Sequence, residues 1–373
     1  MSQKKNHKNT KTIQHPLFGI SLKNWIQLLE RNGGVDRPYL LRGIFITIGS
    51  IVILPIRFLA KLLYGKKINE TSIQNPPVFI IGHWRSGTTY LHELLSQDPQ
   101  FCYVSLWNTL MPDSYVLLNP IKHFLAHFLP DERPMDSIKV EIDGPYEEEA
   151  GIAALSPWSF FHCLHFPKNA EEQYVKSIHF DKLTDKEKTE WKQKFLWFMK
   201  SVTFTNNGKR LLLKNPANTA RIETMLDLFP NAFFIHLYRN PYTVYLSTKK
   251  MRTRVLDKLA LQNAKDHDIE TQIIENYIRV MTTFFSQQKL IPKEQYVEIK
   301  YEDLVKDPIS QVKKIYTILK LPGFENALPG MKRYLESKRD YKTNIYKIDE
   351  KVIQHVSKHW AFTIHRWNYS PPK

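Results

Sequence analysis

Cysteine and glycine are both scarce in this sequence. The 373 residues include only two cysteines, Cys102 and Cys163, and two thiols make neither a disulfide framework nor a four-ligand zinc site. Such scarcity is typical of proteins in a reducing, intracellular compartment. With 13 glycines against 22 prolines, the chain lacks the composition of a linker protein. Its hydrophobic content of 42% and charged content of 24% exclude a disordered, collagen-like or multi-span membrane protein.

Acidic residues are scarce in one segment, which makes the charge uneven. The chain carries 53 Lys and Arg against 37 Asp and Glu, a net charge of +16 with histidine neutral. Residues 1–67 hold 12 of the cations and two acids, so this segment carries +10 and the other 306 residues carry +6. A basic protein usually binds nucleic acid, an anionic membrane or a highly charged small molecule. Because the body has little excess charge and no nucleic-acid motif, we expect no nucleic-acid partner, and the N-terminal charge favours an anionic membrane surface.

The most apolar run of the chain lies inside this basic segment. Residues 43–56 read GIFITIGSIVILPI, with Arg42 before them and Arg57 after them. A spanning helix needs about 20 apolar residues, and cations beside a shorter apolar helix favour contact with anionic lipid head groups. Three interpretations stay open: an interfacial anchor, an ordinary core helix, and a tilted span whose arginines reach the interface. The late start of the run, with no small-residue cleavage site after it, does not indicate a signal peptide.

From residue 76 onward, short apolar runs alternate with helical patterns. The apolar runs lie at residues 78–82, 211–213, 232–238 and 296–299, and the helical patterns follow them at 88–96, at 219–229, after Pro241 and at 308–320. This alternation indicates a parallel sheet covered by helices on both faces. We expect a basic tail and apolar membrane-associating helical segment over residues 1–75, and a single α/β domain over residues 76–373.

A phosphate-binding loop is the strongest motif. Residues 78–95 read VFIIGHWRSGTTYLHELL, so a buried strand ends at Gly82 and a helix starts near Gly87. Such a turn directs several backbone N–H groups at one anion, beside the positive end of a helix dipole, and Arg85 adds a fixed cation. The spacing G-x-x-x-x-G is that of a Walker A loop, but two threonines replace its Lys and Ser/Thr. An ordinary magnesium-dependent nucleotide hydrolase is therefore disfavoured.

The stretch GHWRSGTTYLHELL resembles the loop that holds the 5′-phosphosulfate in sulfotransferases that use PAPS (3′-phosphoadenosine 5′-phosphosulfate). Many members read P-[KR]-[ST]-G-T-T here; this chain has Trp84 in place of the proline and Arg85 as the cation, as in the bacterial and Golgi-type branches. The resemblance implies a P-loop-like three-layer fold, a central parallel sheet flanked by helices, preceded here by the N-terminal apolar helix. It also implies that PAPS is bound by Gly82, Arg85, Ser86, Gly87, Thr88 and Thr89.

A second cation and hydroxyl are expected to complete the donor site. The stretch FFIHLYRNPYTVYLS places Arg239 at the end of an apolar strand and Ser247 about two turns into the next helix. An arginine fork and a hydroxyl that converge on one oxyanion form a phosphate clip. By the resemblance, this clip holds the 3′-phosphate of PAPS.

Three further stretches resemble the family. KNPANTARI (214–222) offers Lys214, which is expected to neutralise phosphate or to face the acceptor substrate. The run at 300–322 resembles the family's Y-E-D-L segment, whose acids we interpret as structural. The C-terminal stretch that begins YKTNIYKIDE resembles the segment that closes over the adenosine end of PAPS, and Lys342 and Asn344 are its candidate contacts.

The general base is harder to assign. The best acidic cluster is GPYEEEAGIAAL at residues 144–155, where adjacent carboxylates beside an apolar run raise one another's pKa, as suits a general base. Glu147 and Glu149 are the candidates. Equally open is a solvated acidic helix start, where glutamates favour the helix dipole. His83 and His92 are rival bases, although a histidine on the helix after the loop is more often structural.

Together these motifs predict a PAPS-dependent sulfotransferase that transfers a sulfuryl group to a hydroxyl or amine and needs no metal, with Arg85 and the loop amides stabilising the charge. The products would be PAP (adenosine 3′,5′-bisphosphate) and a sulfated acceptor. The alternatives are a P-loop kinase or nucleotide hydrolase, and a non-enzymatic basic protein. The apolar, basic N-terminus predicts a lipid or glycan acceptor at a membrane and a cytoplasmic, membrane-associated protein, with a single-span membrane protein as the alternative.

Overall fold

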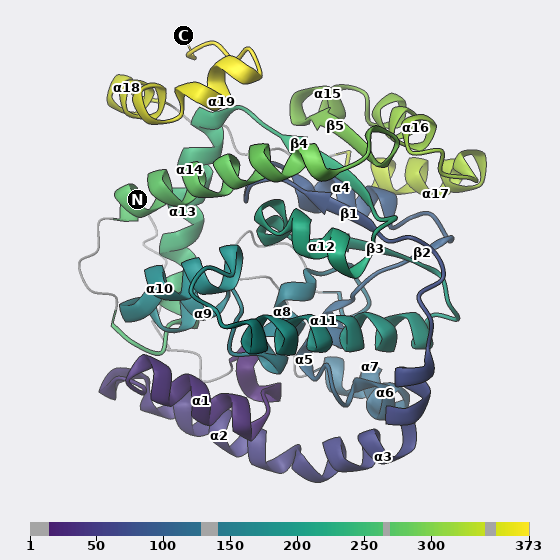
Figure 1. Cartoon of the computed structure of the whole chain (residues 1–373), viewed down its shortest axis with the longest axis vertical. Coiled ribbons are helices and arrows are strands. Elements are labelled where there is room, and N and C mark those ends of the chain that lie inside the picture. Colours follow the sequence, from purple (N-terminus) through teal and green to yellow (C-terminus); the bar gives the residue numbers. More distant parts are fainter. Residues whose placement is uncertain (1–14, 128–140, 264–268, 340–347, 373) are drawn as a thin grey trace, which may run out of the picture.

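A parallel sheet of five strands forms the centre of the structure, a computed structural model that describes residues 15–127, 141–263, 269–339 and 348–372 (Figure 1). The strands lie in the order β2-β3-β1-β4-β5. Their bounds are β1 Val78–Ile81, β2 Phe101–Cys102, β3 Arg210–Lys214, β4 Phe233–Tyr238 and β5 Tyr296–Lys300. Four of them match the predicted apolar runs. The fifth, β2, was not predicted, because two residues at a sheet edge carry no pattern.

Alternation along the strands gives the sheet two buried faces. In β1, Val78 and Ile80 enter one core, while Phe79 and Ile81 enter the other. The first core is closed by α4 Thr88–Leu95, α15 Tyr301–Lys306, α16 Pro308–Ile318 and α17 Phe324–Ser337. The second is closed mainly by α11 Asp185–Thr205, α12 Ile222–Leu228, α13 Pro241–Leu259, α14 Ile269–Gln287, α18 Glu350–His359 and α19 Ala361–Arg366. The predicted three-layer α/β fold is confirmed.

The long connection between β2 and β3 is mostly helical in its described part. Outside residues 128–140, it contains five short helices and α8 before α11 begins. They are α5 Leu106–Leu110, α6 Tyr115–Leu118, α7 Lys122–Ala126, α8 Glu148–Leu155, α9 His162–His165 and α10 Ala170–Tyr174. In Figure 1 this connection lies below the sheet.

The N-terminal residues pack against this connection. Helix α1 (Leu22–Asn32) begins after Ser21, whose hydroxyl accepts a hydrogen bond from the helix, and it ends at Gly33 in a left-handed conformation. A third, smaller core joins both parts of the chain and contains Leu17, Ile20, Trp25, Leu28, Ile46, Ala153, Phe166 and Leu261.

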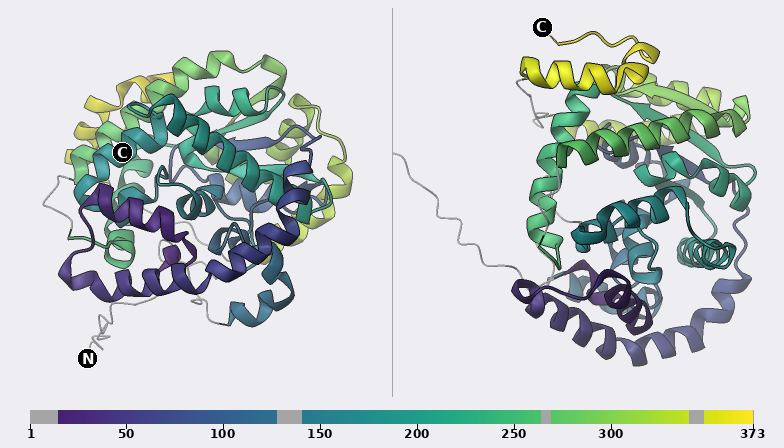
Figure 2. Two further views of the ribbon diagram at one scale, coloured as in Figure 1. Left: turned by 60° about the horizontal axis from the view of Figure 1, so that its bottom comes forward. Right: turned by 60° about the vertical axis from the view of Figure 1, so that its left-hand side comes forward.

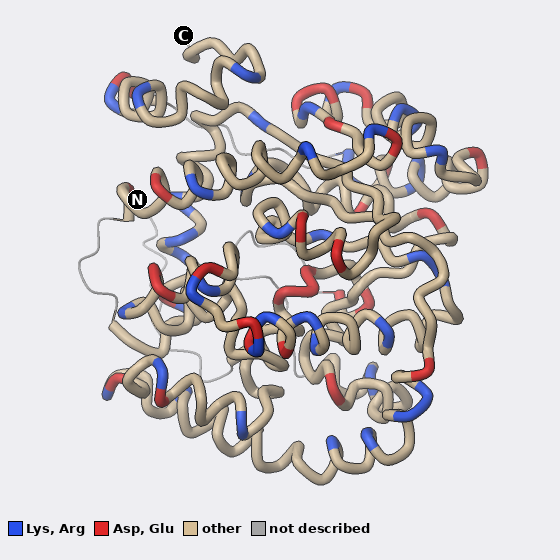
Figure 3. The backbone as a smooth tube through the Cα atoms, viewed as in Figure 1, with Lys and Arg blue, Asp and Glu red and all other residues tan. Residues whose placement is uncertain are grey.

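The apolar run at residues 43–56 belongs to two consecutive helices, α2 (Leu40–Val52) and α3 (Leu54–Glu70). They separate at Ile53 because Pro55 has no N–H to continue the helical hydrogen bonds. By length and composition the stretch Arg37–Glu70 could cross a membrane, which is weak evidence, and 33% of its most apolar window is buried. Figure 2 shows the two helices as an arc along the outside of the molecule, and Figure 3 shows cations but no acidic residues between its ends.

Candidate active site

The loop between β1 and α4 has the tight geometry that its glycines predict. Gly82 has a φ of 145°, and a Cβ atom there would lie 2.2 Å from the carbonyl oxygen of Leu237 in β4. Gly87 has a φ of 97°, and a Cβ there would lie 2.3 Å from the ring of Tyr301. The Ser86 hydroxyl donates to the carbonyl of His83 at 2.7 Å and so closes the loop on itself. Only glycine fits the two ends of this turn.

The predicted second half of the donor site lies directly against this loop. Arg85 Nε donates to the Ser247 hydroxyl at 2.9 Å, and Arg239 Nη1 donates to the carbonyl oxygen of Arg85 at 3.2 Å. The Arg239 guanidinium also lies over the ring of Tyr301, 4.1 Å from its centroid. Arg85 has a φ of 70°, which is unusual for a residue other than glycine. Residues that are 154 and 162 positions apart are thus brought to one place.

The order of the strands explains this convergence. Strands β1 and β4 are adjacent and parallel, so both end at the same edge of the sheet. Arg239 directly follows β4. The next residue, Asn240, caps the start of α13, because its side chain accepts hydrogen bonds from the backbone N–H groups of Tyr242 and Thr243. Ser247 lies further along that helix and faces the loop. Among the described residues, neither Arg85 nor Arg239 has a carboxylate partner within ion-pair distance, so the two cations together suit a bound anion.

Lys214, at the end of β3, connects the phosphate loop to the acidic run. Its Nζ donates to Glu147 Oε1 at 2.5 Å and to the hydroxyl of Thr89 at 3.3 Å. The side chain of Lys214 is 3% exposed and that of Glu147 is 19% exposed. The predicted lysine, the loop threonine and one candidate base therefore form one cluster.

The other two glutamates of the run are buried and point elsewhere. Asn218 donates to Glu148 Oε1 at 2.7 Å, and Glu148 Oε2 has no hydrogen-bond partner within the described part of the chain. Burial raises the pKa of Glu148 to about 7, and the carboxylates of Glu149 and Glu147 add to the rise. A carboxyl with this pKa is partly protonated at neutral pH. The alternative of a solvated acidic helix start is therefore wrong for Glu148 and Glu149.

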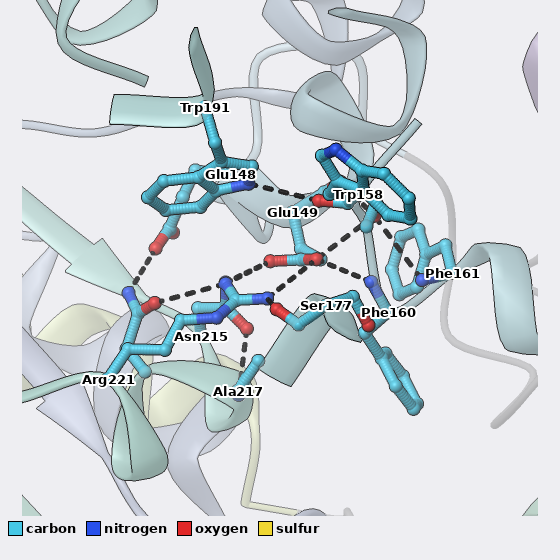
Figure 4. A network of polar contacts seen from close by, with 12 residues as sticks. Glu148, Glu149, Trp158, Phe160, Phe161, Ser177, Trp191, Asn215, Ala217 and Arg221 are labelled. Atoms are coloured by element: carbon cyan, nitrogen blue, oxygen red, sulfur yellow. Dashed lines mark hydrogen bonds and ion pairs between the residues drawn. The ribbon is translucent and has the colours of Figure 1, made fainter. Parts of the chain in front are cut away.

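Glu149 lies in a closed network of polar contacts (Figure 4). Arg221 donates to both of its oxygens, at 2.8 and 3.3 Å, and Asn215 donates to Oε2 at 2.8 Å. Oε1 also accepts from the Ser159 hydroxyl and the backbone N–H of Phe160. Burial by itself would raise the pKa of Glu149, but the guanidinium and these donors hold it below its ordinary value. The expected rise in pKa at this residue is wrong, and its oxygens face protein donors instead of an open site.

The two histidines are buried and neutral. His92 on α4 contacts the backbone carbonyl of Leu212 at 3.3 Å, and burial with the nearby Lys214 lowers its pKa to about 3. His83 contacts the carbonyl of Trp84 at 2.9 Å, and burial lowers its pKa to about 4. A ring nitrogen of each is held by the backbone, which agrees better with a structural role than with proton transfer.

The C-terminal candidates Lys342 and Asn344 lie outside the described residues. The helix that follows them, α18, lies against α13, and the hydroxyls of Ser357 and Tyr242 are 2.7 Å apart. The C-terminal segment therefore returns to the helix that carries Ser247.

An aromatic pocket lies beside the phosphate loop and was not predicted. Its wall is lined by His83, Trp84, Phe160, Cys163, Tyr174, Thr248, Met251 and Arg252, among others. The Trp84 and Phe160 rings lie 4.5 Å apart. The Thr248 hydroxyl, next to Ser247 in sequence, is buried without a hydrogen-bond partner among the described residues. The only available signal was Trp84 in place of the usual proline, since the other wall residues come from four distant segments.

Comparisons with known proteins agree with this geometry. The model of a family described as the sulfotransferase family matches residues 76–326. A relative is the omega-hydroxy-beta-dihydromenaquinone-9 sulfotransferase Stf3 of Mycobacterium bovis, which is 31% identical to this chain over 356 residues. The match covers 95% of this chain and 91% of the relative, and the protein of the same name from Mycobacterium tuberculosis matches equally.

Solved structures show the same fold at low sequence identity. Sulfotransferase STF9 from Mycobacterium avium superposes with a TM-score of 0.71 and 14% identity, covering 93% of this chain and 96% of that one. Sulfotransferase STF1 from Mycobacterium tuberculosis H37Rv superposes with a TM-score of 0.64 and 17% identity, covering 91% and 90%.

Proposed function

The chain belongs to the sulfotransferase family and is a transferase, and we propose that it transfers a sulfuryl group from PAPS to a hydroxyl group of a lipid. The observation that carries the proposal is the contact of Arg85 with both Ser247 and Arg239 at the ends of two adjacent strands. PAPS supplies an activated sulfuryl group. The kinase or nucleotide-hydrolase alternative is not favoured, because the loop has threonine where such enzymes have the Walker lysine.

The donor set fits a ligand with two separate anionic ends. The loop amides from Gly82 to Thr89, with the Arg85 guanidinium and the threonine hydroxyls at the start of α4, would hold the phosphosulfate end. Arg239 and Ser247 would hold the 3′-phosphate. Two arginines without carboxylate partners in the described chain support this assignment, because unneutralised cations at a helix start attract anions.

Glu147 is the residue we propose as general base. Of the three adjacent glutamates it is the one whose carboxylate bonds to Lys214, beside the loop hydroxyl of Thr89. The buried pairs of Glu148 with Asn218 and Glu149 with Arg221 fix the start of α8 and so position Glu147. Lys214 would orient this carboxylate and neutralise charge on the transferred group.

The acceptor is proposed to enter the aromatic pocket. Its wall of Trp84, Phe160 and Tyr174 favours an apolar molecule over a glycan, and it adjoins the loop that would hold the sulfuryl group. The relative from Mycobacterium bovis is named for a hydroxylated menaquinone derivative. A lipid acceptor agrees with a protein that is cytoplasmic and associated with an anionic membrane surface, which we also propose.

Ligand-dependent heat stability tests the donor assignment. We expect PAP to raise the melting temperature of the wild-type protein, and we expect Arg85→Ala and Arg239→Ala to abolish this rise. Arg333→Ala, at an exposed position on α17, is the matched control and should keep it. Stabilisation by ATP with Mg²⁺ but not by PAP would overturn the proposal.

Transfer of labelled sulfate tests the acceptor and the base. With labelled PAPS, we expect product from a prenylated quinol that carries a terminal hydroxyl, and none from a soluble sugar. Glu147→Gln should lower kcat by about 10²- to 10⁴-fold while the PAP-induced stabilisation persists. A Glu147→Gln enzyme with wild-type kcat would refute the choice of base, and transfer to the sugar alone would refute a lipid acceptor.

A further inference from the structure

Exposed apolar side chains are concentrated on α2 and α3. Of the 17 large apolar residues that are exposed in the described chain, 11 lie between Leu40 and Leu63. Phe58 is 71% exposed, Leu62 is 69% exposed and Leu41 is 65% exposed. We call these exposed apolar side chains between Leu40 and Leu63 the apolar ridge. A soluble monomer rarely exposes so many large apolar side chains within one segment, so the ridge calls for a partner.

The opposite side of α2 is attached to the body of the protein. Arg42 is a charged residue in the otherwise apolar helix α2, and its Nη1 donates to the carbonyl of Ala260 at 2.8 Å. At Gly49 a Cβ atom would lie 2.4 Å from the ring of Phe18, so the backbone of α2 directly contacts the segment before α1. The helix therefore has one packed side and one outward side along its length.

Helix α3 is attached in the same way. Arg57 Nε donates to Asp113 Oδ2 at 2.7 Å, and its Nη1 donates to the carbonyl of Ile20 at 3.0 Å. A helix that crossed a bilayer would have to give up these bonds and place both arginines in hydrocarbon, which is energetically unfavourable. The contacts therefore disfavour the span, and the exposed ridge disfavours an ordinary core helix.

The charges near the ridge favour an anionic bilayer over a second protein copy. No Asp or Glu occurs between residues 37 and 69, while six Lys and Arg do. Lys61, Lys66 and Lys67 are exposed beside the ridge on α3. Two copies that paired through this surface would bring like charges together, whereas anionic head groups would attract them. The arc in Figure 2 follows the outside of the molecule.

We propose that α2 and α3 form an in-plane membrane-docking arc, which immerses the apolar ridge in one leaflet of an anionic bilayer and keeps both ends of the arc on the same side. The inference needs neither PAPS nor a particular acceptor, because it stands on exposure, attachment and charge. A docked arc would hold the enzyme at the surface in which a lipid acceptor resides.

Flotation with lipid vesicles tests the docking. We expect the wild-type protein to float with phosphatidylglycerol-containing vesicles, and the double variant Phe58→Glu/Leu62→Glu to bind at least about tenfold more weakly. The matched control Leu290→Glu/Val305→Glu introduces the same charge at exposed apolar positions outside the ridge and should bind as the wild type does. Retention of the PAP-induced stabilisation shows that a variant is folded; circular dichroism serves if PAP does not bind.

Light scattering separates the bilayer from a second copy. A wild-type dimer that becomes monomeric in the ridge variant, with vesicle binding unchanged, would overturn the proposal. So would equal loss of vesicle binding in the ridge variant and the control, since that would reflect added charge alone.

Labelling of introduced cysteines separates docking from spanning. Arg37→Cys and Glu70→Cys place thiols at the two ends of the arc, at exposed positions, and the native Cys102 and Cys163 are buried. With protein added outside sealed vesicles, we expect a membrane-impermeant maleimide to label both variants. Protection of one end would indicate a spanning helix and would overturn the in-plane arrangement.

Discussion

Replacing Arg221 by methionine is expected to destabilise the protein more than most single substitutions. Its guanidinium lies in a fully buried site against the rings of Phe180 and Trp191 and donates to both oxygens of Glu149. Methionine keeps much of the volume but leaves the Glu149 charge buried without its cation. Removing one member of a buried ion pair costs about 3–5 kcal/mol.

This cost translates into a measurable change in melting temperature. An unfolding entropy of about 2.1 cal/mol/K per residue gives a decrease of about 4–6 °C for a chain of this length that unfolds cooperatively. Calorimetry and urea titration of the two proteins measure the change. The matched control is Arg279→Met, because Arg279 pairs with Glu171 at 3.1 Å on the surface, with side chains 42% and 57% exposed. Surface pairs of this kind contribute about 1 kcal/mol or less.

A double variant isolates the cause. Glu149→Gln removes the charge and keeps one oxygen, which can still accept from the Phe160 N–H and the Ser159 hydroxyl, while its amide nitrogen replaces the oxygen that accepts from Asn215. In the Arg221→Met background, this second change should restore about 1–2 kcal/mol. If the double variant is no more stable than Arg221→Met alone, the uncompensated carboxylate is not the source of the cost. The ion pair with Arg221 would then no longer favour a structural role for Glu149 over that of a base.

Two further predictions concern acid and the loop. Burial lowers the pKa values of His15 and His162 from 6.5 to about 4, so the neutral side chains stabilise the fold fully above pH 6.5. This contribution, about 3 kcal/mol for each histidine, is lost as the pH falls towards 4, and the urea midpoint of unfolding should fall over the same range. A variant with asparagine at both positions should show a smaller fall, and an equal fall would contradict the assignment. Gly87→Ala should destabilise the protein and weaken PAP-induced stabilisation, because the added Cβ would meet the Tyr301 ring. The control Gly208→Ala, at a φ of 74° with open space around it, should lower the free energy of unfolding by only about 1–2 kcal/mol. Equal melting temperatures for the two variants would rule out a steric effect at Gly87.

The donor half of the site could be predicted because its signals are local. Gly82 and Gly87 have fixed spacing after an apolar run, and Arg239 with Ser247 have fixed spacing after another. Parallel strands then bring the two segments to one edge of the sheet. The structure confirms that these segments meet, while the roles of the individual residues stay predictions.

The acidic run could not be interpreted from sequence alone. Whether a glutamate there has a raised or lowered pKa depends on partners far along the chain, and Arg221 is 72 positions from Glu149. Three adjacent residues at a helix start also point in different directions, so only Glu147 meets Lys214. The same holds for the apolar run at 43–56, since composition does not reveal which side of α2 is packed.

The position of Glu147, Phe160 and Tyr174 within one connection has a consequence for how such enzymes diversify. Most of the proposed acceptor-side residues, Glu147, Phe160 and Tyr174, lie between β2 and β3, with Trp84 as the exception in the phosphate loop, whereas the proposed donor residues lie in the segments that follow β1 and β4. Natural selection, or an engineer who exchanges this connection between relatives, can therefore alter what is sulfated while the machinery for the common donor is inherited unchanged.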